Sequence, residues 1–215
     1  LVEGPLAIPF KRVREAFLAV DRLDVEVWLV SSAGTLEPWQ RPSRFFSSIP
    51  LEEMPAIYAS CDFLVKLSAV EGMFGPPLEI MSQGGIPITS DVTGHDEYMV
   101  NEVNGYVVGD GDWREARRIL VELCANMEAL ESVRMAARST AEQFNFPASS
   151  RRLNDALLLA ARNPHSEPFP FEKLQRQSTD YMRRYHGIED LRPLRFKGGL
   201  GARRPVVTRE SAFSA

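Results

Sequence analysis

Residues with thiol or metal-binding chemistry are scarce in this chain of 215 residues. Its only two cysteines, Cys61 and Cys124, lie far apart and form no Cys-x-x-Cys pair. Such sparse cysteine is typical of a reducing compartment and argues against a thiolate metal site. The three histidines, His95, His165 and His186, are also scattered. We therefore expect a cytoplasmic protein without a thiolate or histidine-rich metal site.

Long apolar runs and a strong net charge are also missing. No stretch approaches the roughly 18 apolar residues that a membrane-spanning helix needs. The net charge of −4 arises from 25 basic and 29 acidic residues, so charge gives no reason to expect nucleic acid as a partner. The hydrophobic content of 44% is that of an ordinary globular protein.

Three well-known motifs are absent from the sequence. No Gly-x-Gly-x-x-Gly follows the first predicted strand, which argues against a nicotinamide or flavin dinucleotide site. No Walker loop is present, and no Gly-x-Ser-x-Gly turn that would carry a nucleophilic serine. We accordingly expect no organic cofactor.

Short apolar strands alternate with segments of helical periodicity along the chain. The predicted strands are Leu1–Val2, Val25–Val30, Arg44–Phe46, Asp62–Leu67, Ile86–Thr89 and Tyr106–Val108. The predicted helices are Phe10–Arg22, Leu51–Ser60, Gly75–Gly84, Trp113–Met127, Ser132–Gln143 and Ala148–Ala161. This alternation predicts an α/β fold, a Rossmann-like doubly wound parallel sheet of about six strands with helices on both faces. Met54, Tyr58 and Trp113 are predicted to be core residues.

The character of the sequence changes near residue 163. We expect residues 1–162 to form the α/β domain, and residues 163–215 to hold a linker, a helix over Phe171–Arg184 and a basic extended tail. A solvated tail is the favoured interpretation, with docking onto a partner domain or an anionic membrane surface as the alternative. The chain enters a strand almost at once from Leu1, so we interpret it as a piece of a longer protein.

Glu71 and Glu79 flank the segment EGMFGPPLE, with seven residues between them. The segment follows the fourth predicted strand, and ligands bind beyond the carboxyl ends of strands in such sheets. Its glycines let the backbone approach a ligand, and the helix that starts at its proline pair would favour a diphosphate. Glu79 could accept hydrogen bonds from a ribose, and Glu71 from a sugar. Equally, Glu79 is a favourable acid in a first helical turn, and Glu71 an exposed loop residue.

Two further residues are candidates for the same site. Lys11 follows the first strand and a Pro-bearing loop, where it could neutralise a diphosphate leaving group, although a surface lysine at a helix start would look the same. His95 follows the fifth strand and could contact a phosphate or a base, or it could be an ordinary turn residue.

The segment LEEMPAIYASCDFLVKLSAVEGMFGPPLEIMSQGGIPITSDVTGHDEYMVNEVNGYVVGD, residues 51–110, resembles the donor-binding half of group 1 (family 4) retaining glycosyltransferases. The resemblance extends from about Val2 to Gln143. Members of this family have the GT-B fold, two Rossmann-like domains with the active site between them. The resemblance implies that the chain is the C-terminal half of such an enzyme, and that the N-terminal acceptor domain is absent from it.

The resemblance also implies roles for particular residues. Glu71 is expected to be the catalytic residue beside the donor sugar, Glu79 to bind the ribose, and Lys11 to neutralise the diphosphate. The backbone that approaches the sugar and diphosphate is expected to be that of Met73, Phe74 and Gly75. The donor would be a UDP- or GDP-type sugar, and no metal would be required.

The chain departs from the family pattern in two places. The family usually has Glu-Gly-Phe-Gly-Leu, whereas this chain has Glu-Gly-Met-Phe-Gly, which displaces the second glycine by one position. An arginine that often precedes the family's lysine is not evident near Gly4-Pro5, and Arg12 is a candidate substitute.

The function expected from the resemblance is sugar transfer to a glycan or lipid-linked acceptor, of hexosyltransferase type, in bacterial surface polysaccharide synthesis. Peripheral contact with the inner membrane face would be compatible with it. One alternative is a degenerate, non-catalytic GT-B domain kept for subunit contacts. Another is a sugar-nucleotide epimerase of similar architecture.

Overall fold

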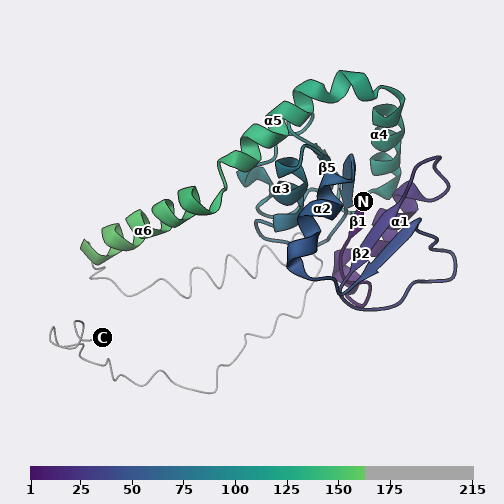
Figure 1. The fold of residues 1–215 in the computed structure, drawn as a ribbon, viewed down its shortest axis with the longest axis horizontal. Helices are drawn as coiled ribbons and strands as arrows, with labels where there is room; N and C mark the ends of the chain where they lie inside the picture. The colour runs from purple at the N-terminus through teal and green to yellow at the C-terminus, as the bar shows by residue number, and fades with distance from the viewer. Residues whose placement is uncertain (163–215) are drawn as a thin grey trace, which may run out of the picture. The chain divides into compact units, whose positions relative to one another are not determined.

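The computed structural model describes residues 1–162 (Figure 1). These residues contain a six-stranded sheet in the order β3-β2-β1-β4-β5-β6. Every pair of neighbouring strands in it is parallel. The strands are β1 (Val2–Glu3), β2 (Trp28–Ser31), β3 (Arg44–Ser47), β4 (Phe63–Lys66), β5 (Ile86–Ser90) and β6 (Tyr106–Val108). The predicted Rossmann-like fold and its strands are therefore confirmed, with shifts of up to three residues at the ends.

The six predicted helices are also present, as α1 (Val13–Val20), α2 (Met54–Ala59), α3 (Gly75–Ser82), α4 (Trp113–Ala125), α5 (Glu131–Glu142) and α6 (Phe146–Arg162). Short 3-10 turns occur at η1 (Pro9–Lys11), η2 (Leu51–Glu53), η3 (His95–Glu97) and η4 (Met127–Leu130). The helix predicted for Phe10–Arg22 is wrong at its start, because Arg12 adopts a left-handed conformation with φ of 47°. That residue separates η1 from α1.

Helices cover both faces of the sheet and divide the core into two layers. On one face α1 packs against α4, and Phe17 and Leu120 lie in the same apolar cluster as Val2 and Val65. On the other face α3 packs against both α2 and α5, which lie on either side of it in Figure 1. Ile80 of α3 and Leu64 of β4 there lie in the same apolar cluster.

Side-chain alternation along the strands determines which residues share the face covered by α2 and α3. On β4, Val65 points to the α1 layer and Leu64 to the α3 layer, so Lys66 lies on the α3 side. On β1, Val2 points to the α1 layer, so Glu3 also lies on the α3 side. Because Val2 pairs with Val65, Glu3 and Lys66 are neighbours across the two strands.

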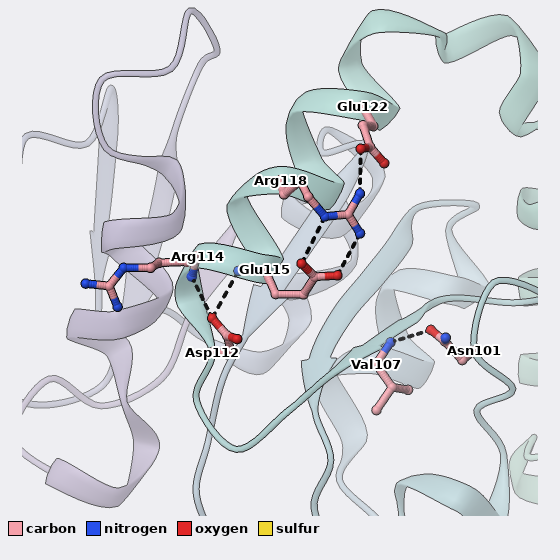
Figure 2. Close-up of polar contacts among 7 residues, drawn as sticks. All are labelled: Asn101, Val107, Asp112, Arg114, Glu115, Arg118 and Glu122. Atoms are coloured by element: carbon pink, nitrogen blue, oxygen red, sulfur yellow. Dashed lines mark hydrogen bonds and ion pairs between the residues drawn. The ribbon is translucent and has the colours of Figure 1, made fainter.

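Exposed polar contacts cap the start of α4 and line its outer surface (Figure 2). Asp112 caps α4 by accepting hydrogen bonds from the backbone N–H groups of Arg114 and Glu115. Further along α4, Arg118 binds the carboxylates of Glu115 and Glu122. These contacts lie on the outer surface of the helix and orient no residue of the predicted site.

Residues Leu1–Leu159 form one compact unit of the chain. Within residues 1–162, no helix is long and apolar enough to cross a membrane. The helix predicted for Phe171–Arg184 and the basic tail lie outside the described residues, so both stay predictions.

Candidate functional site

The loops that follow β1 and β4 meet where the strand order reverses. The chain runs outward from β1 through β2 to β3 and then returns to β4 on the other side of β1, which makes β1 and β4 the switch point of the sheet. The N–H of Ala69 donates to the carbonyl oxygen of Phe10 over 2.7 Å and joins the two loops. Lys11 and Glu71, one on each loop, lie at this junction.

The ammonium of Lys11 donates to Oε1 of Glu71 over 2.7 Å, and both side chains are largely buried. The turn η1 places Lys11 here: it begins at Pro9 and ends where Arg12 enters the left-handed region. Arg12 itself pairs with Asp110 in the loop after β6, so its suggested role as a second diphosphate ligand gains no support. Lys11 and Glu71, which are 60 residues apart in the sequence and were predicted as separate candidates, thus form one ion pair.

Glu79 lines a cavity of about 210 Å³ on the β1 side of α3. The same cavity is lined by Glu3, Val30, Ser31, Ser32, Ser48, Ile49, Leu51, Met54, Tyr58 and Pro76. The phenol of Tyr58 faces Glu79, and its pKa is raised above the ordinary range by burial, by Glu79 and by Glu3. The loop after β3 lines one side of the cavity, and the N–H of Ser48 in it donates to the carbonyl oxygen of Ser31 over 3.1 Å.

The start of α3 offers fewer anion ligands than an ordinary helix N-terminus. Of the first four helical residues, Pro76 and Pro77 have no N–H, which leaves those of Gly75 and Leu78. The side chain of Phe74 is buried, and its carbonyl oxygen accepts a hydrogen bond of 3.0 Å from Tyr98. A diphosphate at this helix would therefore depend more heavily on nearby side-chain cations.

The structure shows where the residues of the displaced glycine motif lie. The side chain of Phe74 is buried, Gly75 is the first residue of α3, and Met73 lies on the surface with 41% of its area exposed. Seven residues still separate Glu71 from Glu79, so the displaced glycine does not change the length of the segment.

His95 lies in a loop that contacts the segment after Glu71. A Cβ built on its neighbour Gly94 would be 2.8 Å from the backbone nitrogen of Met73, which shows how closely the two loops approach. Nδ1 of His95 is 2.6 Å from the carbonyl oxygen of Val92 and 3.5 Å from Asp91. The ring is thus tied into its own turn at the edge of the cleft.

Three residues of this region were not predicted as site residues: Lys66, Glu3 and Tyr58. Lys66 is 4% exposed, and its ammonium lies 2.6 Å from Oε2 of Glu3 and 4.0 Å from Oε1 of Glu71. A lysine in the otherwise apolar strand DFLVKL was a visible signal, because lysine is rarely buried without a partner. Tyr58 was predicted as core, and it is buried, but it also lines the cavity beside Glu79. Nothing in the local sequence indicates that contact.

A second cavity, of about 390 Å³, lies at the opposite end of the strands. It is lined by the carboxylates Asp24, Glu26 and Asp62, and its described lining residues include no lysine, arginine or histidine. This lining therefore offers a phosphate group no cationic side chain. Within residues 1–162, no three His, Cys, Asp or Glu side chains gather to hold a metal ion.

Comparison with known families finds a match over the part of the chain that carries Glu71 and Glu79. Residues 38–140 match the family model described as glycosyl transferases group 1. That segment includes Glu71, Glu79 and the whole of α3, and it confirms the resemblance to this family. A sequence search among curated proteins found no match.

Solved structures with the same fold include three informative neighbours. HepE from Anabaena, in complex with UDP-glucose, has 18% identity and a TM-score of 0.60, over 74% of this chain and 48% of its own. Sucrose-phosphate synthase from Thermosynechococcus elongatus has 19% identity and a TM-score of 0.60, over 74% and 46%. The C-terminal domain of the group 1 glycosyl transferase LpcC from Francisella tularensis has 17% identity and a TM-score of 0.56, over 66% and 84%.

These neighbours establish the fold at low sequence identity. The matched region spans about half the length of HepE and of sucrose-phosphate synthase, and most of the isolated LpcC domain. The fold is therefore the one expected for one half of a GT-B enzyme.

Proposed function

Because residues 38–140 match the group 1 glycosyl transferases, we propose that this chain is the donor-binding domain of a glycosyltransferase. The enzyme would transfer a sugar from a nucleoside-diphosphate sugar to a glycan or lipid-linked acceptor. HepE, which has the same fold, binds UDP-glucose, and this makes a UDP-sugar the first donor to test.

The observation that carries the proposal is the Lys11–Glu71 ion pair at the switch point, together with Glu79 in α3, the helix that follows Glu71. A diphosphate needs a cation at the carboxyl ends of β1 and β4, and Lys11 is in that place. A nucleoside needs a cavity with a carboxylate for the ribose, and the cavity beside Glu79 provides one. In this proposal the diphosphate and sugar would lie at the Lys11–Glu71 pair, and the nucleoside in the cavity beside Glu79.

Each residue then has a distinct task in the reaction. Lys11 would neutralise the charge that develops on the diphosphate as the sugar leaves. Glu71 would bind the sugar hydroxyls near the reacting carbon, and Glu79 the ribose. The backbone of Met73, Phe74 and Gly75 would approach the sugar and diphosphate, with His95 at the rim.

Finer features of the proposal rest on the family resemblance. They are retention of anomeric configuration, hexosyl transfer, independence from metal ions, and a role in surface polysaccharide synthesis. In this proposal an N-terminal domain supplies the acceptor site, so the chain alone is expected to bind the donor without transferring sugar. The epimerase alternative is less favoured, because the family match is to transferases.

Titration calorimetry of the chain with UDP, GDP, UDP-glucose and GDP-mannose tests the proposal. We expect one nucleotide, and the nucleotide sugar that contains it, to bind at a single site. If none of the four ligands binds, the proposal is wrong and the degenerate-domain alternative is favoured.

A further inference from the structure

A buried lysine beneath the cleft has no role in the function proposed so far. Lys66 is 4% exposed, and its ammonium is hydrogen-bonded to Glu3, at 2.6 Å from Oε2 and 3.3 Å from the backbone oxygen. Burying a charge is costly unless partners compensate for it, so a lysine here has to be explained. Glu3 accounts for part of the compensation.

The second carboxylate near Lys66 is Glu71. Its Oε1 lies 2.7 Å from Lys11 and 4.0 Å from Lys66, so one oxygen faces two cations. Glu71 is held in the cleft by Lys11 through a direct hydrogen bond and by Lys66 through charge alone. The four residues form a chain of alternating charge, Glu3, Lys66, Glu71 and Lys11.

The two lysines differ in their freedom to move. Lys11 is 21% exposed on the loop after β1 and can turn toward an incoming anion. Lys66 projects from the centre of the sheet, is 4% exposed and is fixed by two oxygens of Glu3. A diphosphate that attracts Lys11 would therefore remove the only hydrogen bond that the structure records for Glu71 among the described residues.

We propose that Lys66 is a positioning residue of the donor site, which holds the Glu71 carboxylate at the sugar when a diphosphate draws Lys11 away. This inference rests on the proposed function. It assigns Lys66 no contact with the donor, and it gives a reason for a lysine inside the sheet. Because the start of α3 has few N–H donors, the diphosphate would depend on Lys11 for its binding. A second cation, Lys66, would then be needed to hold Glu71.

The test separates the sugar from the nucleotide. Dissociation constants for UDP and UDP-glucose, and for GDP and GDP-mannose, are measured by calorimetry on the chain and on Lys66→Met. We expect the variant to weaken binding of the sugar-bearing probe about tenfold more than that of its nucleotide, because the mispositioned Glu71 carboxylate loses a hydrogen bond to the sugar. In a Glu71→Ala background, Lys66→Met should change this ratio no further.

Two variants guard against an effect of misfolding. Glu3→Gln/Lys66→Met removes both charges of the buried pair, so that no carboxylate is left unpaired, and should show the same ratio. Arg134→Met removes a cation that pairs with Asp62 at 2.8 Å, at the opposite end of β4, and should leave the ratio as in the parent chain.

Equal weakening of both probes by Lys66→Met, or an additional change in the Glu71→Ala background, would overturn the inference while leaving the proposed function intact. If the parent chain binds neither nucleotide nor nucleotide sugar, the proposed function fails, and this inference fails with it.

Discussion

Gly75→Ala separates the folding role of α3 from its proposed binding role. Gly75 is the first residue of α3 and its φ is not in the left-handed region, so alanine fits the backbone. Alanine is favoured over glycine in helices by up to about 1 kcal/mol, so we expect the variant to unfold at the same or a slightly higher temperature.

The added methyl group has one close neighbour in the structure. A Cβ at Gly75 would lie 3.1 Å from Oε1 of Glu79 and 3.7 Å from its Cδ. The side chain of Glu79 is exposed and flexible enough to move by a few tenths of an ångström, so the fold is not strained. That movement displaces the carboxylate from the place where it would receive the ribose hydroxyls.

Nucleotide binding should therefore weaken while stability does not. A hydrogen bond to a charged group contributes about 1.5–3 kcal/mol, so partial loss of this contact is expected to weaken UDP or GDP binding roughly tenfold. Calorimetry and thermal unfolding of the same sample measure both effects. Gly109→Ala is the matched control, because nothing lies within 4 Å of its added Cβ. Unchanged nucleotide affinity in Gly75→Ala would refute the assignment of Glu79 to the ribose.

Three other predictions concern side chains of the proposed site and one arginine outside it. Lys11→Met should weaken UDP or GDP binding by about tenfold to a hundredfold and reduce its dependence on salt, which titrations at two ionic strengths would reveal. Glu79→Ala should weaken nucleotide binding, whereas Glu71→Ala should mainly weaken the additional binding of the sugar; equal, negligible effects would contradict the site assignment. Arg117→Met should lower the free energy of unfolding by about 2 kcal/mol and leave nucleotide affinity unchanged, because Arg117 donates to three carbonyl oxygens at the end of α1. Chemical denaturation measures that loss, and a stability equal to that of the parent chain would exclude a role for these bonds.

The strands β4 and β5 could be predicted because each is a short apolar run. DFLVKL and IPITS became β4 and β5, since fully buried parallel strands are nearly continuous in hydrophobicity. The helix starts were harder. The left-handed residue Arg12 divides a segment whose apolar spacing is helical throughout, and no proline or glycine marks that position.

The candidate site was predictable where it lies in one segment and less so where it depends on distant ones. Glu71, Glu79 and the helix between them were visible together, and the order of the strands brings Lys11 to the same place. The pairing of Glu3 with Lys66 depends on the register between β1 and β4, which are sixty or more residues apart in the chain. Local periodicity cannot determine such a register, so the charged chain beneath the cleft emerged only from the structure.

The most direct test of the central claim is to map the nucleotide on the chain by NMR. A ¹⁵N-labelled sample is titrated with UDP-glucose, and with GDP-mannose if the first does not bind. The proposed donor site predicts amide shifts concentrated near Lys11, Ser48 and the segment from Glu71 to Glu79. Shifts concentrated instead around Asp24, Cys61 and Cys124, at the opposite end of the strands, would contradict it.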